Sequence, residues 1–219
     1  MRTSNPKLTV LEVLLAELSP ISGKTVLDIG WGKGRLRGPL EKAGACWRGL
    51  DPASAITDLP IDIAPAEAMP YANNSFAAAI CVNALHHVPI ATMDAALCEA
   101  ARVVRPDARL VVIEPKTAGA LSQVISVIDD ETQIRTAAQG AMDRSRALKQ
   151  INAYDYERIE RYTGFDTFAQ SLIAVDPDRN DLVKARYEDL RHSFEAMARR
   201  VRGELTLSQP MSVRVFQPL

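Results

Sequence analysis

The chain has 219 residues, of which 47% are hydrophobic and 24% are charged, and its formal net charge is -1 at pH 7. This composition is typical of a globular domain and excludes a largely disordered chain. The near-neutral charge gives no electrostatic basis for binding nucleic acid or an anionic membrane. Three cysteines without paired spacing predict neither a disulfide framework nor a metal site. With no apolar segment of membrane-spanning length, we expect a cytoplasmic protein.

The first predicted element is an amphipathic helix within residues 1–20. Leu8, Leu11, Leu15 and Leu18 recur at helical spacing, and glutamates interrupt the apolar run. This pattern is typical of a surface helix rather than of an export signal.

Strands and helices are predicted to alternate over residues 25–115. Apolar runs predict strands, and helical spacing predicts helices between them. The predicted strands cover 25–30, 46–51, 61–64, 76–83 and 108–115, and the predicted helices cover 33–45 and 91–104. None of these strands alternates apolar with polar residues, as is typical of strands that are buried on both faces. The pattern therefore predicts an α/β fold with a mostly parallel, Rossmann-like sheet and helices on both faces.

The rest of the chain has a different pattern. Residues 118–150 have helical spacing, and two further strands are predicted at 166–175 and 204–216. Between those strands one long helix is predicted, with an apolar stripe that packs on the sheet; a seam for a partner helix is the alternative. The stripe comprises Val183, Tyr187, Leu190, Phe194, Met197 and Val201.

These elements predict one domain over 1–219. We expect a cofactor-binding half at 21–116, a helical insertion after the fifth strand at 117–163 that forms a lid and acceptor region, and a C-terminal strand pair with the long helix at 164–219.

A glycine-rich loop follows the first predicted strand. Asp28, Gly30, Gly32 and Gly34 form the pattern D-x-G-x-G-x-G, which lets backbone approach a ligand closely or serves only as a turn. A dinucleotide-binding loop needs its third glycine one residue later. An aspartate here would repel a pyrophosphate but suits a cationic ligand without phosphate, such as S-adenosylmethionine. Trp31 either shields this ligand or packs on a neighbour, and packing is favoured.

A second acidic residue, Asp51, ends the second predicted strand and precedes Pro52. Its paired oxygens suit both hydroxyls of an adenosine ribose. The structural alternative is a helix cap or a turn residue before the proline.

At these residues the chain resembles class I S-adenosylmethionine-dependent methyltransferases, and more narrowly those of ubiquinone and menaquinone biosynthesis. Three segments carry the resemblance in order: "VLDIGWGKGRL", "AEAMPYANNSFAAAICVNALHHV" and "ARVVRPDARLVVIEP". It covers roughly residues 20–116. Beyond Lys116 only the topology is similar, with an antiparallel last strand.

The resemblance implies a set of cofactor contacts. Asp28, Gly30 and Gly32 would face the methionine portion, and Asp51 the ribose. Ala66 and Glu67 would lie near the adenine, and Asn83 near the amino group.

Three positions depart from the family pattern. Pro65 replaces an aspartate that reaches the adenine amine, which puts that hydrogen bond in doubt. Ala77 replaces an acid, and Asp107-Ala108 replaces a glycine pair, both without an evident chemical consequence.

Methyl transfer needs a general base only when the acceptor arrives protonated. His86 and His87 follow the fourth predicted strand at the edge where α/β sheets bind ligands, so they are the candidate bases. The alternative is that they pack and form hydrogen bonds in the turn. Tyr154, Tyr156 and Tyr162 are candidates to line the acceptor pocket, although tyrosines on such segments more often pack.

The leading hypothesis is therefore S-adenosylmethionine-dependent methyl transfer to a small molecule without a metal. The alternative is a catalytically silent S-adenosylmethionine-binding protein with a regulatory or structural role. A nicotinamide-dependent oxidoreductase is a third hypothesis, against which the glycine spacing argues. Macromolecular acceptors such as RNA or protein would need a basic groove or a recognition domain, and the sequence predicts neither.

Overall fold

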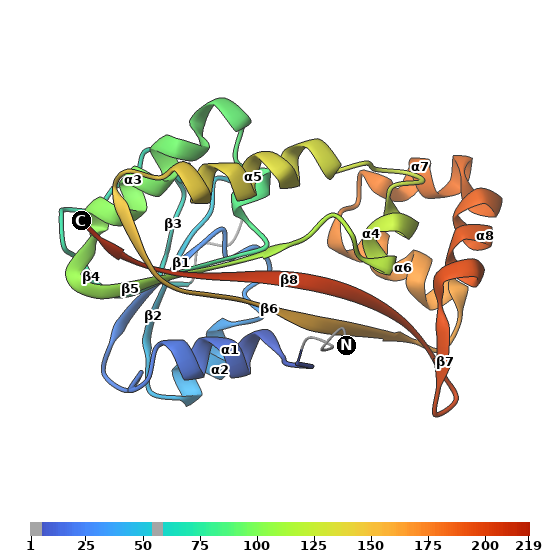
Figure 1. The fold of residues 1–219 in the computed structure, drawn as a ribbon, viewed down its shortest axis with the longest axis horizontal. Coiled ribbons are helices and arrows are strands. Elements are labelled where there is room, and N and C mark those ends of the chain that lie inside the picture. The colour runs from blue at the N-terminus through green and yellow to red at the C-terminus, as the bar shows by residue number, and fades with distance from the viewer. Residues whose placement is uncertain (1–5, 54–58) are drawn as a thin grey trace.

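The computed structural model of the protein describes residues 6–53 and 59–219. Residues 1–5, part of the predicted first helical region, and 54–58, part of the segment between the second and third predicted strands, lie outside the described residues. In the described part, eight strands form one sheet in the order β3-β2-β1-β4-β5-β8-β6, with β7 paired to β8 (Figure 1). None of its helices has the length and apolar character needed to cross a lipid bilayer.

The first half of the sheet is parallel. Its strands are β1 (Thr25–Ile29), β2 (Cys46–Leu50), β3 (Ile61–Asp62), β4 (Phe76–Val82) and β5 (Val104–Pro115). All neighbouring pairs among them are parallel. Val26, Leu27 and Ile80 are fully buried, as expected for strands covered on both faces.

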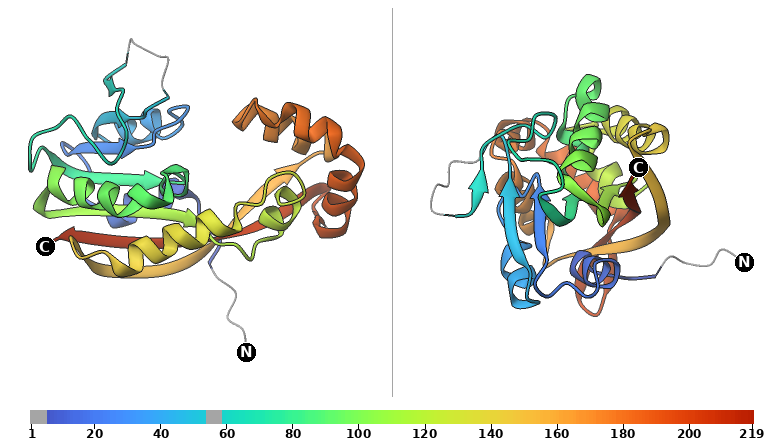
Figure 2. Two further views of the ribbon diagram at one scale, coloured as in Figure 1. Left: turned by 90° about the horizontal axis from the view of Figure 1, so that it is seen from above. Right: turned by 90° about the vertical axis from the view of Figure 1, so that its left-hand side faces the viewer.

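Helices cover both faces of this sheet, as Figures 1 and 2 show. One face packs in a core cluster with α3 (Met93–Val103) and α5 (Thr132–Arg144). The other face packs with α1 (Val10–Glu17) and α2 (Arg37–Lys42). The predicted Rossmann-like α/β class is therefore confirmed.

The C-terminal strands are antiparallel to this half. The last strand, β8 (Glu204–Pro218), lies between β5 and β6 (Leu148–Tyr162) and is antiparallel to both. The predicted antiparallel last strand is confirmed.

The predicted helical insertion at 117–163 is correct only in its first part. It contains α4 (Ala120–Ile125) and α5, but residues 148–162 form the strand β6. Tyr154 and Tyr156 lie on one face of β6 with Asp155 between them, the period-two pattern of a strand, and β6 pairs along most of β8. The many charged residues of this segment obscure the strand pattern in the sequence. The strand forms because it pairs with β8, which is distant in sequence.

The predicted strand at 166–175 is wrong. Residues Phe165–Val175 form the helix α6, in which Phe168, Ala169 and Leu172 are buried. These positions lie on one helical face, so the apolar run reflects a helix buried along one side rather than a strand.

The single long helix predicted over 183–201 is also wrong. The segment contains α7 (Arg179–Ala185), α8 (Tyr187–Met197) and the short strand β7 (Arg199–Val201). Of the predicted stripe, Val183, Leu190 and Phe194 are buried, whereas Tyr187, Met197 and Val201 are 37–43% exposed.

These helices form a C-terminal lobe, which we define as α4, α6, α7, α8, β7 and the ends of β6 and β8 that extend beyond β5. Figure 2 shows the lobe projecting from the sheet. It has its own hydrophobic cluster, which includes Leu207 of β8 and in which the rings of Phe168 and Phe194 stack with centroids 4.9 Å apart. The apolar stripe thus packs mainly on other helices of the lobe rather than along the sheet.

Candidate cofactor and acceptor site

The glycine loop after β1 has the backbone conformation that its sequence requires. Gly30, Gly32 and Gly34 have φ values of 71°, 56° and 70°, a region that side chains disfavour. A Cβ on Gly30 would lie 2.4 Å from Cβ of Ala84, whereas one on Gly32 would meet no atom of the described residues within 4 Å. Gly30 therefore packs against the turn after β4, and the backbone of Gly32 faces open space.

Asp28 lies beneath this loop at the end of β1. It is 2% exposed, and its Oδ2 accepts a hydrogen bond of 3.0 Å from the indole N–H of Trp47. Burial raises the pKa of Asp28 to about 7, against the effect of the indole hydrogen bond, and the nearby charge of Asp51 raises it further. A cation beside Asp28 would favour its charged form.

Trp31 packs beneath the loop rather than standing free. Its ring lies edge-on to that of Trp47, with centroids 5.7 Å apart, and the residue is only 6% exposed. It also lies against Gly34, where a Cβ would be 2.7 Å from the Trp31 ring. The packing interpretation of Trp31 agrees with this arrangement, and a contact with a cofactor stays a prediction.

Asp51 ties the loop to the end of β2. Its Oδ2 accepts from the amide of Gly32 at 3.1 Å, and its Oδ1 accepts from the amide of Ala53 at 2.9 Å. The turn role considered from the sequence is thus present, with Pro52 exposed beside it. Because each carboxylate oxygen has two lone pairs, these bonds leave acceptor capacity for ribose hydroxyls.

Asn83 follows β4 at the same edge of the sheet. It has φ of 51°, and its side-chain Oδ1 is buried without a hydrogen-bond partner among the described residues. Strained backbone and an unsatisfied buried acceptor are both typical of a ligand site. An ammonium group would supply the missing donor, so the position fits the amino group of S-adenosylmethionine.

Ala66 and Glu67 lie in the turn that follows β3. Ala66 packs on the core face that includes α3, and Glu67 accepts a 3.3 Å hydrogen bond from the hydroxyl of Thr92. The structure gives them no further distinguishing contact, and their role near the adenine stays a prediction.

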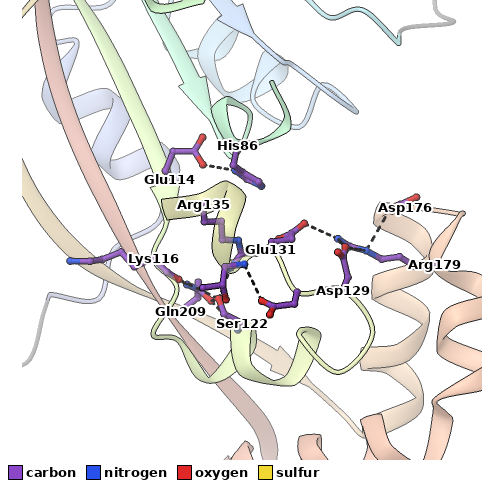
Figure 3. Close-up of polar contacts among 12 residues, drawn as sticks. His86, Glu114, Lys116, Ser122, Asp129, Glu131, Arg135, Asp176, Arg179 and Gln209 are labelled. Atoms are coloured by element: carbon purple, nitrogen blue, oxygen red, sulfur yellow. Dashed lines mark hydrogen bonds and ion pairs between the residues drawn. The ribbon is translucent and has the colours of Figure 1, made fainter. Parts of the chain in front are cut away.

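The two candidate bases occupy different environments in the turn after β4. His86 is 3% exposed, and its Nδ1 pairs with Oε2 of Glu114 (Figure 3). His87 is exposed, and its ring centroid lies 4.1 Å from that of His86. Desolvation by the surrounding protein lowers the pKa of His87, and His86 lowers it further. His87 is therefore neutral near pH 7 and able to accept a proton.

Glu114 was not among the residues singled out from the sequence. It lies near the end of β5 and is 1% exposed. Besides His86, it accepts from the amides of Ala84 at 3.1 Å and Leu85 at 2.8 Å. The available signal was an acid directly after the apolar run of a buried strand, since buried carboxylates need partners.

The three candidate tyrosines pack in hydrophobic clusters instead of meeting in an acceptor pocket. Tyr156 is fully buried, and Tyr154 packs against the same cluster on the α1 side of the sheet. Tyr162 packs in the lobe against Phe168 and Phe194. The packing alternative therefore holds for all three residues. Tyr154 and Tyr156 pack in the cluster beside α1, whereas Tyr162 packs in the lobe.

A polar network that the sequence did not reveal joins the lobe to α5 (Figure 3). Arg179, only 9% exposed, bonds to Asp129 at 2.6 Å and to Glu131 at 3.0 Å. Glu131 also accepts from Arg135 at 2.5 Å, and Arg135 donates to Ser122 of α4 at 2.5 Å. These contacts hold the lobe beside the sheet edge on which His86 lies.

The lobe also reaches the glycine loop. The ammonium group of Lys33 donates to the backbone carbonyl of Ala174, near the end of α6. The carboxyl edge of the sheet, where the glycine loop, Asn83 and the histidines come together, is therefore bordered by the lobe.

A family model described as "Methyltransferase domain" matches residues 27–112. This segment extends from β1 to within β5 and contains the glycine loop, Asp51, Asn83 and the histidine pair. No curated protein sequence matches the chain.

Solved structures match over nearly the whole chain at low identity. A proposed methyltransferase from Bacillus halodurans is 13% identical with a TM-score of 0.59, and 96% of this chain and 99% of that chain are covered. The cyclase SpnF is 14% identical with a TM-score of 0.61, covering 100% and 88%. Geranyl diphosphate methyltransferase in complex with S-adenosylmethionine is 16% identical with a TM-score of 0.56, covering 95% and 84%. At such identity the likeness shows the fold alone.

Residues 27–112 thus match a methyltransferase domain, and the resemblance to methyltransferases found in the sequence is confirmed at that level. The narrower likeness to ubiquinone and menaquinone methyltransferases is not specifically supported.

Proposed function

We propose that the protein transfers a methyl group from S-adenosylmethionine to a small-molecule acceptor. The observation that carries this proposal is that, within the described part of the chain, the backbone of Gly32 is open and the buried Oδ1 of Asn83 has no hydrogen-bond partner. Both lie where strands of the parallel sheet end, the edge at which such sheets bind ligands.

The chain supplies complementary groups for the cofactor. Asp28 and Asn83 would hold its ammonium group, and the free lone pairs of Asp51 its ribose hydroxyls. Ala66 and Glu67 would border the adenine. When bound, S-adenosylmethionine supplies a methyl group on a cationic sulfur.

The acceptor is proposed to lie between the histidine turn and the lobe. There the chain has to align the acceptor and exclude water. His86 or His87 would take the proton of a hydroxyl or acidic carbon acceptor. The lobe borders this space through Arg179 and through Ala174, whose carbonyl accepts a hydrogen bond from Lys33 of the glycine loop.

Titration of the pure protein with S-adenosylmethionine and S-adenosylhomocysteine by calorimetry tests the cofactor site. We expect a binding free energy of about -7 to -8 kcal/mol. Asp51→Ala and Gly32→Val should each weaken binding at least tenfold, by removing ribose acceptors or blocking the open backbone. Asp181→Ala, whose side chain is 92% exposed in the lobe, is the matched control and should bind normally. Unchanged affinity in both site variants contradicts the assignment.

Both tryptophans of the chain, Trp31 and Trp47, lie at this site. Intrinsic fluorescence should therefore change on cofactor binding and give an independent titration.

Turnover separates an enzyme from a silent binding protein. The protein should release S-adenosylhomocysteine when offered a panel of small phenols, amines and carboxylic acids. Binding without turnover across a broad panel favours the regulatory alternative, and tight binding of a nicotinamide dinucleotide would contradict the proposal.

A further inference from the structure

We propose that Glu114 is a positioning residue that fixes the ring tautomer of His86 and leaves Nε2 as the nitrogen able to take a proton. This inference rests on the proposed function, in which a histidine of this turn serves as the base. Glu114 itself would touch neither the cofactor nor the acceptor.

The two carboxylate oxygens of Glu114 bind different partners. Oε1 accepts from the backbone amides of Ala84 and Leu85, at 3.1 and 2.8 Å, and Oε2 pairs with Nδ1 of His86. Both Glu114 and His86 are buried, at 1% and 3% exposure. The carboxylate therefore fixes the turn and the imidazole ring together.

The tautomer follows from which groups can donate. A carboxylate only accepts, so Nδ1 of His86 has to carry the proton in the pair. In the neutral ring Nε2 is then unprotonated, and it forms no hydrogen bond with the described residues. Figure 3 shows the ring extending from Glu114 toward the side on which Glu131 lies. The negative charge of Glu114 would also stabilise the imidazolium formed after proton transfer.

Glu114→Gln is the decisive substitution because glutamine has nearly the shape of glutamate but carries a donor NH2 group in place of one acceptor oxygen. Backbone amides can only donate, so the glutamine oxygen has to face Ala84 and Leu85. Its NH2 group then faces Nδ1 of His86, which has to become the acceptor. The proton moves to Nε2, and this nitrogen can no longer take one.

Nitrogen NMR of the full-length, 15N-labelled protein reads the tautomer directly. The chain has three histidines, His86, His87 and His192, and His86→Asn assigns the signal of interest. At about pH 8, where an ordinary imidazole is neutral, wild-type His86 should carry its proton on Nδ1. In Glu114→Gln it should carry it on Nε2.

Glu131→Gln is the matched control, since Glu131 has no hydrogen bond with His86, and it should leave the tautomer unchanged. A wild-type His86 protonated on Nε2 overturns the proposal, and this result needs no variant to fold. A folded Glu114→Gln that keeps the proton on Nδ1 overturns it as well.

Cofactor titration distinguishes this inference from the proposed function. Glu114→Gln should bind S-adenosylmethionine within about twofold of wild type, because it removes no ground-state contact with the cofactor. With any acceptor that supports turnover, its kcat should fall about 100-fold. If wild type does not bind the cofactor, the proposed function fails, while the tautomer measurement still decides the role of Glu114.

Discussion

The parallel half of the sheet and the C-terminal lobe differ in how their strands end. β1, β2 and β4 have five to seven residues and stop at one edge, where the turns that carry the site begin. β6 and β8 have 15 residues each, and only part of β8 pairs with β5. Their outer ends carry the lobe on a separate hydrophobic cluster. The strands that carry the candidate site and the neighbouring lobe are thus stabilised by different hydrophobic clusters.

The largest effect is expected from Gly30→Val, which tests whether the parallel half depends on tight contact between its turns. Valine at φ 71° is strained, and its Cβ would overlap Ala84. We expect a loss of about 4 kcal/mol in the free energy of unfolding and no detectable cofactor binding. Denaturant unfolding and calorimetry measure these effects. Wild-type stability would show that the two turns do not pack as described.

Phe194→Ala tests whether the lobe unfolds independently. Phe194 is fully buried in the lobe cluster and stacks on Phe168. The substitution should destabilise the lobe by about 3 to 4 kcal/mol. Hydrogen exchange should accelerate in α6 and α8 while β1 and β4 keep their protection. Uniform loss of protection would mean that the two cores form one cooperative unit.

Asp28→Asn should stabilise the parallel half while weakening its site. Between the ordinary pKa of 3.8 and the folded value of about 7, the folded state keeps a proton that the unfolded state has lost. The free energy of unfolding therefore falls as pH rises through this range. Asparagine does not ionise, so the variant does not lose stability over this pH range. Its free energy of unfolding above pH 7 should exceed that of wild type by on the order of 3 kcal/mol.

The two proteins should converge in stability only below about pH 3, well under the ordinary pKa of 3.8, because Asp28 is then protonated in both the folded and the unfolded state. Urea unfolding at a series of pH values measures this difference. The variant should also bind S-adenosylmethionine more weakly, because the proposed partner of its ammonium group is lost. A stability difference that does not depend on pH would contradict the buried, protonated state of Asp28.

Arg179→Ala tests the connection between the two regions and has the smallest expected effect. The substitution removes the largely buried guanidinium group that pairs with both Asp129 and Glu131. We expect a loss of about 2 kcal/mol and faster hydrogen exchange in α7. Arg191→Ala removes a surface arginine of α8 that is 47% exposed and pairs with Glu188. It is the matched control and should cost less than about 0.5 kcal/mol.

The sequence predicted the secondary structure correctly where the local residue pattern reflects how each element is buried in the fold. The strands of the parallel half are buried on both faces, so continuous apolar runs identified them, and the glycine spacing identified the loop. The same reasoning failed at 148–162 and 166–175. There the strand is defined by pairing with β8 and the helix by packing in the lobe, and neither partner is near in sequence.

The sequence alone determined the class of fold, the position of the glycine loop and the edge of the sheet that carries the candidate residues. It did so because short-range spacing dictates turn conformation and strand burial. Only the tertiary structure decided that Trp31 packs on Trp47, that Asp51 binds the loop amide and that Glu114 holds His86. These contacts join residues 16 to 28 positions apart, and pairing of strands is what brings them together.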